Sequence, residues 1–146
     1  MTPHTPTPSK PDPNHHPASW QALTVPLPAG ETHLLAPLRR IAAANLVSWD
    51  VPQIVTDDVL LALTELATNG LQHTAGPIRV HLLGHVTSTY LQVEDTSSDQ
   101  PQRTSAGFPA ERSGGFGLEI IETLASKTFS RIRPGRGKII TAKFNH

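Results

Sequence analysis

The sequence contains no cysteine, and this absence removes several kinds of chemistry. Without a thiol, the chain cannot form a disulfide, bind zinc through thiolates or attack a substrate with a cysteine nucleophile. Chains without disulfides are typical of reducing compartments, so the composition predicts a cytoplasmic protein.

Long apolar runs are missing as well. No stretch approaches the roughly 18 consecutive apolar residues that a membrane-spanning helix needs. The segment MTPHTPTPSK at the start of the sequence lacks the basic beginning and the apolar core of a secretory signal. We therefore expect a soluble protein that has no membrane partner.

An excess of either charge is also absent, because the chain has 12 basic and 12 acidic side chains. The segment from Lys127 to His146 nevertheless holds six basic residues and no acidic one. Its aromatic residues are Phe129 and Phe144, and no nucleic-acid-binding motif accompanies them. This pattern favours a solvated strand face or a surface for an acidic partner over direct contact with nucleic acid.

Three common catalytic signatures are incomplete. The dinucleotide-binding fingerprint lacks its third glycine, since that position is Ile120. The P-loop pattern fails twice, because Ile132 replaces its first glycine and Ile139 replaces its serine or threonine. The G-x-S-x-G elbow of serine hydrolases does not occur. These classes of enzyme are therefore excluded.

The composition of the chain changes near position 20. Residues 1–19 contain six of the 14 prolines and three of the eight histidines, and their only apolar residues are Met1 and Ala18. Burial of so few apolar groups cannot offset the entropy lost when the segment becomes ordered. We expect a disordered Pro/His-rich arm over 1–19 and one folded domain over 20–146.

Apolar spacing predicts the helices at the start of this domain. Before position 50, apolar residues recur at helical intervals, and Pro37 must lie in the first turn, so this helix begins no earlier than about His33. Pro52 opens a second helix over QIVTDDVLLALTELATNGLQH, which is apolar on nearly all sides and is expected to be deeply buried. The apolar stripe of the first helix consists of Leu35, Leu38, Ala42, Leu46 and Trp49.

After the second helix, the spacing of apolar residues changes, and this change predicts the remaining elements of the domain. Apolar and polar residues alternate over 78–82 and over 90–94, which predicts a β-hairpin. Residues 96–115 have no period, and a compact domain rarely leaves so long a segment unstructured unless it serves as a lid. Helical spacing returns over 117–126, and a last hairpin turns at 134–137. The predicted order is helix, helix, two strands, lid, helix and two strands.

Three polar residues line the second helix at intervals of four: Glu65, Asn69 and His73. This spacing places them on one face, with about 6 Å between successive residues along the helix axis. A buried helix keeps polar groups when they bind something, but the end of a helix also meets solvent. From these residues alone, both interpretations stay open.

Two more features carry potential chemistry. Asp95 follows a strand alternation and precedes the aperiodic segment, a position shared by ligand-binding carboxylates and by turn-forming aspartates. The run from Ser113 to Gly117 leads into the last predicted helix, where free backbone N–H groups suit a phosphate. A serine cap followed by a flexible hinge would give the same pattern.

Taken together, these residues resemble a known set of motifs. Glu65-Leu-Ala-Thr-Asn69, Asp95 and Gly115-Phe-Gly117-Leu118 are similar to the ATP-binding boxes of the histidine-kinase, gyrase and heat-shock-chaperone ATPase superfamily. The small size and the stretch GGFGLEIIETLA look closest to the bacterial anti-sigma-factor serine kinases and related stand-alone ATP-binding regulators. The resemblance covers roughly residues 20–144. It implies an α+β fold of the Bergerat type, a two-layer sandwich of a mostly antiparallel sheet with three helices on one face.

The resemblance also assigns a role to each motif. It makes Glu65 the general base and Asn69 the ligand of Mg²⁺, and it places His73 near the phosphates of ATP. It makes Asp95 the acceptor for the adenine amino group. The remaining ATP contacts that it implies are Gly114, Gly115, Gly117 and Leu118.

Two residues depart from the pattern of that superfamily. Its members usually carry glycine two residues after the adenine-binding acid, where this chain has Ser97. Many also carry threonine directly after the glycine of the last hairpin, where Lys138 follows Gly137. The first departure concerns the fit of the purine.

The resemblance implies two functions that remain open. One is an anti-sigma factor that binds a sigma factor and, with ATP and Mg²⁺, phosphorylates a serine of an anti-anti-sigma protein. The other is a non-catalytic switch in which ATP orders a surface that binds a partner protein. Glu65 favours the kinase, whereas Ser97 and Lys138 favour the switch. The resemblance also implies a homodimer.

Overall fold

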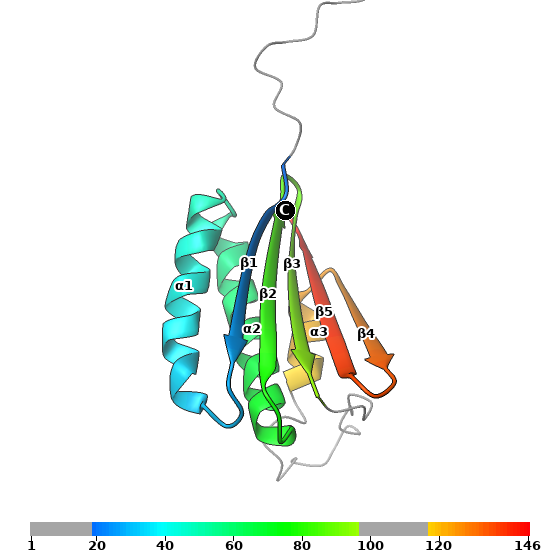
Figure 1. The fold of residues 1–146 in the computed structure, drawn as a ribbon. Helices are drawn as coiled ribbons and strands as arrows, with labels where there is room; N and C mark the ends of the chain where they lie inside the picture. Colours follow the sequence, from blue (N-terminus) through cyan, green and yellow to red (C-terminus); the bar gives the residue numbers. More distant parts are fainter. Residues whose placement is uncertain (1–18, 97–116) are drawn as a thin grey trace, which may run out of the picture.

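The computed structural model describes residues 19–96 and 117–146, which form a sheet and a layer of helices (Figure 1). The expected arm over 1–19 lies outside the described residues except for its last position, and the expected lid over 96–115 does so except for its first. The elements are β1 (Gln21–Leu27), a 3-10 turn (Thr32–Leu34), α1 (Leu35–Ser48), α2 (Gln53–His73), β2 (Ile78–His85), β3 (Ser88–Asp95), α3 (Gly117–Leu124), β4 (Lys127–Arg133) and β5 (Gly137–Asn145).

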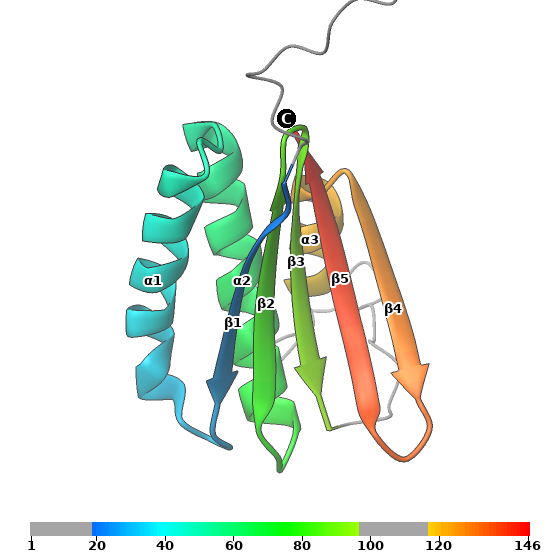
Figure 2. The ribbon, with the colours of Figure 1, turned by 45° about the horizontal axis from the view of Figure 1, so that its top comes forward.

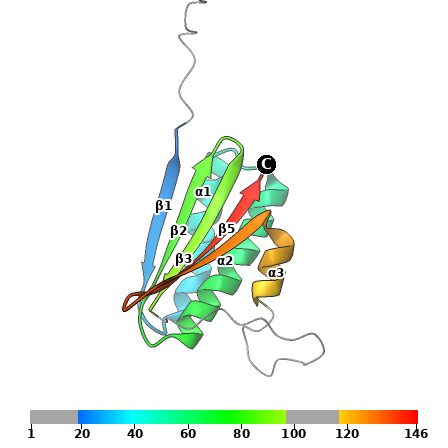
Figure 3. The same ribbon diagram turned by 90° about the vertical axis from the view of Figure 1, so that its right-hand side faces the viewer.

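The five strands form one sheet in the order β1-β2-β3-β5-β4, and every neighbouring pair is antiparallel. Seen from the side, α1, α2 and α3 all lie on the same face of this sheet (Figure 3). The predicted α+β two-layer sandwich is therefore confirmed.

The strand β1 is absent from the sequence prediction, which was wrong to begin the domain with a helix. Leu23, Val25 and Leu27 alternate as in a strand, but Pro26 argues against one because it has no N–H for the ladder. In the structure β1 lies at the edge of the sheet and pairs only with β2. Proline is tolerated there because one side of an edge strand needs no partner.

The helix-covered face of the sheet carries the core. Ile78, Val80 and Leu82 of β2 are buried, as are Leu91 and Val93 of β3, which confirms the alternation read from the sequence. These side chains pack against the helices, so burial of apolar surface joins the two layers. The helical part of the core includes Leu38, Ala42, Leu46, Val59, Ala62, Leu63, Leu66, Ala67 and Leu71.

The two long helices differ in how well the sequence predicted them. Pro37 lies in the first turn of α1, as expected. The helix α2 is less buried than predicted, because Ile54 is 74% exposed and Leu61 is 41% exposed. One side of α2 faces the core while another meets solvent, and the apolar residues on that outer side misled the prediction.

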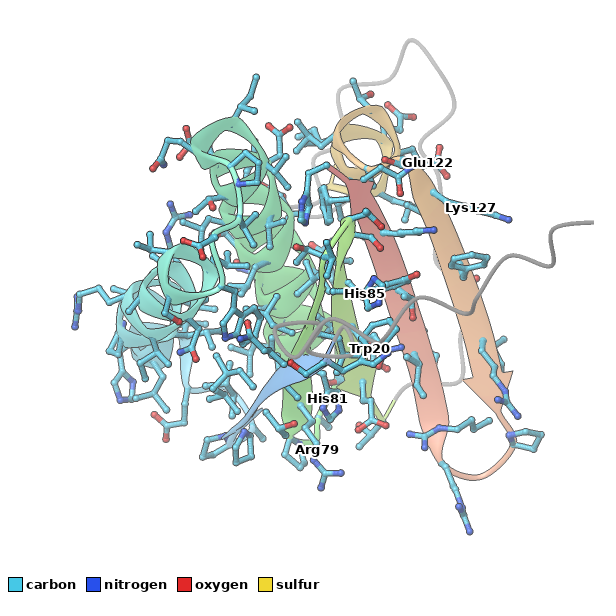
Figure 4. The ribbon with its side chains drawn as sticks, turned by 90° about the horizontal axis from the view of Figure 1, so that it is seen from above. Trp20, Arg79, His81, His85, Glu122 and Lys127 are labelled. Atoms are coloured by element: carbon cyan, nitrogen blue, oxygen red, sulfur yellow. The ribbon has the colours of Figure 1, made fainter. Side chains whose placement is uncertain are left out.

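The opposite face of the sheet is not covered by the helices (Figure 4). Trp20, just before β1, packs its ring against that of His85 of β2, with 4.7 Å between ring centroids and a tilt of 36° between the ring planes. Strand alternation places most of the basic residues of β4 and β5 on this open face. They are Lys127, Arg131, Arg133 and Lys143.

Within the described residues, every helix is too short or too polar to cross a bilayer.

Candidate functional site

Four chain segments that are distant in sequence meet at one end of the sandwich. The C-terminal end of α2, the end of β3, the start of β5 and the start of α3 lie together at the lower end of Figure 1, and the tilted view of Figure 2 agrees. Most of the predicted site residues belong to these segments. The fold therefore brings the α2 motif, Asp95 and the first residues of α3 to a common edge.

Glu65 and Asn69 are both half-buried on α2, one helical turn apart. Among residues 19–96 and 117–146, neither side chain has a hydrogen bond or an ion pair that holds it. Their oxygen atoms are therefore available to a ligand. His73 is the last residue of the helix and is exposed.

The side of α2 that carries Asn69 is set by the neighbouring helices. Arg39 of α1 donates a hydrogen bond to the hydroxyl of Thr64, so Thr64 marks the flank of α2 that faces α1. Asn69 comes five residues later, which is about 140° further round the axis. It therefore lies away from α1, and the other neighbour of α2 in the helical layer is α3.

Asp95, the last residue of β3, is buried and 6% exposed. It pairs in register with Lys138, and the Lys138 Nζ lies 3.4 Å from the Asp95 Oδ2. The lysine side chain is only 12% exposed and the aspartate side chain 5%. A carboxylate so far from water needs polar or cationic partners, and this ammonium group is one of them.

Gly137 fixes the approach of β5 to the end of β3. Its φ is +97°, and a Cβ atom added there would lie 1.9 Å from the carbonyl oxygen of Asp95. Only glycine fits a backbone that is both left-handed and this close to its neighbour. This contact places the next residue, Lys138, beside Asp95.

A second glycine, Gly76, also lies close to the end of β3. A Cβ atom on Gly76, in the loop after α2, would lie 2.6 Å from the Thr96 Oγ1. The loop therefore passes close to the residue that follows Asp95. Sequence reasoning missed the role of Gly76, although a lone glycine between a helix and a strand is a signal of close backbone approach.

The helix α3 begins at Gly117, and Leu118 in its first turn is half-buried. The first N–H groups of a helix have no partner within the helix, so this end can accept an anion. Two other predicted phosphate contacts, Gly114 and Gly115, lie outside the described residues, as does Ser97.

The residues at this edge fit Mg²⁺ bound together with a nucleotide. Carboxylate and amide oxygens are the donors that Mg²⁺ prefers, and the amide oxygen of Asn69 is one of them. The described residues contain no group of three or more metal-binding side chains.

Comparison with known proteins adds one finding. Residues 27–144 match the family model described as the histidine kinase-like ATPase domain. The match begins at the last residue of β1 and ends within β5, so it includes α2, Asp95 and Lys138. No curated protein gives a significant match to the chain.

Proposed function

The chain belongs to the histidine kinase-like ATPase domain family, and from this premise we propose that it is a cytoplasmic anti-sigma factor with protein serine kinase activity. Family membership implies that the domain binds ATP. The finer proposal adds that it binds a sigma factor and transfers the γ-phosphoryl group of ATP to a serine of an anti-anti-sigma partner.

The observation that carries this proposal is the pair of Glu65 and Asn69 on α2. Both are half-buried, and no side chain of the described residues engages them. They lie on the helix that runs toward the edge where Asp95 and the start of α3 also lie (Figure 1). A carboxylate and an amide kept in this state serve a ligand better than they serve the stability of the fold.

In the proposed reaction, Glu65 accepts the proton of the attacking serine hydroxyl. The serine oxygen then forms a bond to the γ-phosphorus as the bond between that phosphorus and the β,γ-bridging oxygen breaks, and ADP leaves. Asn69 would hold Mg²⁺ through its amide oxygen. Mg²⁺, when bound, neutralises the negative charge that gathers on the phosphate oxygens.

A second candidate function is an ATP-gated binding switch without catalysis. The observation that favours it is Lys138, which pairs with Asp95 at a position where many relatives of this type carry threonine. An altered base pocket is compatible with a protein that has kept nucleotide binding for regulation alone. The two functions differ in whether phosphate is transferred.

The substitution Glu65→Gln separates the two functions. It keeps size and polarity, so Mg·ATP binding measured by calorimetry is expected to stay within about twofold, while serine phosphorylation falls by about 100- to 10,000-fold. Radiolabelled γ-phosphate transfer to a cognate anti-anti-sigma protein is the readout. Asp58→Asn is the matched control, because Asp58 lies on α2 about two turns earlier, on nearly the same face.

Transfer by the Glu65→Gln variant at the wild-type rate would show that Glu65 is not the base. Absence of transfer by the wild-type protein to any cognate partner, together with intact ATP binding, would instead support the switch.

A further inference from the structure

The ion pair between Asp95 and Lys138 has a specific geometry. The two residues are register partners on neighbouring strands, and both share the sheet face of buried residues such as Val93 and Ile140. The two side chains therefore lie next to each other on the helix-covered side, at the edge where the nucleotide is proposed to bind. Gly137 holds the two backbones close enough for this contact.

The pair offers two kinds of hydrogen-bonding group side by side. A carboxylate only accepts hydrogen bonds, and its two oxygens can accept several at once. An ammonium group only donates and has three N–H bonds to give. The pair can therefore bind a ligand edge that presents a donor beside an acceptor, while the ion pair itself stays in place.

Adenine has such an edge, with the donor 6-amino group next to the acceptor N1. We propose that Lys138 is a base-reading residue whose ammonium group donates to N1 of adenine while Asp95 accepts from the 6-amino group. This proposal rests on the proposed ATP site. Guanine in the same position would set its O6 against the Asp95 carboxylate and its N1–H against the Lys138 ammonium, so the pair selects ATP over GTP.

A nucleotide analogue tests this contact without changing the protein. In 1-deaza-ATP a C–H group replaces N1 and the 6-amino group is kept. Wild-type protein is expected to bind 1-deaza-ATP about 10- to 100-fold more weakly than ATP, the range for a lost hydrogen bond to a charged group. The wild-type protein is also expected to bind GTP at least as weakly as 1-deaza-ATP. Isothermal titration calorimetry with Mg²⁺ in excess measures all three affinities.

Combining a protein variant with the nucleotide analogue gives a double-mutant-type cycle for the contact between Lys138 and N1. Lys138→Met keeps much of the length of the side chain and removes its donors, so this variant is expected to bind ATP and 1-deaza-ATP equally. Lys143→Met is the matched control, because Lys143 lies on the same strand but on the open face, near the ring of Tyr90. The control is expected to distinguish the two nucleotides as the wild type does.

Each other outcome overturns the proposal in a recognisable way. Equal binding of ATP and 1-deaza-ATP by the wild type would show that Lys138 does not read N1. Tighter binding of ATP by Lys138→Met would show that the lysine blocks the site, and equal binding of GTP would show that the pair does not select the base. Failure of the wild type to bind any of the nucleotides would overturn the ATP site itself, and the proposed function with it.

Discussion

Two adjacent acidic residues at the end of β3 are held in contrasting ways on opposite faces of the sheet. Glu94 lies on the open face, where its carboxylate contacts Arg79 at 3.5 Å, His81 at 3.3 Å and Arg133 at 3.2 Å. Asp95 lies on the helix-covered face and is held by Lys138 at 3.4 Å.

The environments of the two carboxylates differ as much as their partners do. The Glu94 side chain is 18% exposed and its partner Arg79 is 58% exposed, whereas the Asp95 side chain is 5% exposed beside a lysine that is 12% exposed. Cross-strand ion pairs near solvent contribute little to stability individually. A buried acid is costly to keep, so its position at the edge of the proposed ATP site points to a role in binding.

Among variants that test this comparison of the two carboxylates, Gly137→Ala is expected to change stability the most. In Gly137→Ala the new Cβ atom would meet the carbonyl oxygen of Asp95 on a left-handed backbone, so the variant is expected to lose at least about 3 kcal/mol of unfolding free energy or fail to fold. Gly135→Ala is the matched control, since Gly135 has a φ of +73° in the same turn but nothing within 4 Å. It is expected to lose about 1–2 kcal/mol.

Urea denaturation followed by circular dichroism measures both losses. If the two alanine variants were equally stable, the close approach between β5 and the end of β3 would not constrain the site.

The second expected effect concerns nucleotide affinity. Asp95→Asn is nearly isosteric but places an amide donor beside Lys138, so ATP binding is expected to weaken about 10- to 100-fold. Glu94→Gln is the matched control on the neighbouring residue. It is expected to keep ATP affinity within about twofold and to lower the unfolding free energy by less than about 1 kcal/mol.

Calorimetric titration with Mg·ATP measures the affinities of both variants. A larger loss of ATP affinity in Glu94→Gln than in Asp95→Asn would reverse the assignment of the two faces.

Periodicity predicted most of the elements because it is visible without tertiary information, whereas the fold class came from the resemblance to the ATPase superfamily. The alternation around Val80 and Val93 is visible in the chain and is buried as expected. The strand β1 was missed because a proline such as Pro26 argues against a strand in the middle of a sheet. Proline is compatible with an edge strand, but only the assembled sheet shows that β1 lies at the edge.

The positions of the candidate site residues in the fold were predictable, but their contacts were not. The spacing of Glu65 and Asn69 identified a polar face of α2, and the position of Asp95 identified a strand end. The pairing of Asp95 with Lys138 depends on the register between β3 and β5, and 42 residues lie between these two positions in the chain. No local pattern encodes such a register.

The most direct test of the central claim is hydrogen–deuterium exchange of the wild-type protein with and without saturating Mg·ATP. The claim is that nucleotide binds at the edge formed by the end of α2, Asp95 and the start of β5. Protection is predicted for amides in 65–76 and 136–140, with no change at the hairpin between β2 and β3, which lies at the other end of the sheet (Figure 1). Unchanged exchange at the proposed edge, or protection confined to that hairpin, would contradict the account.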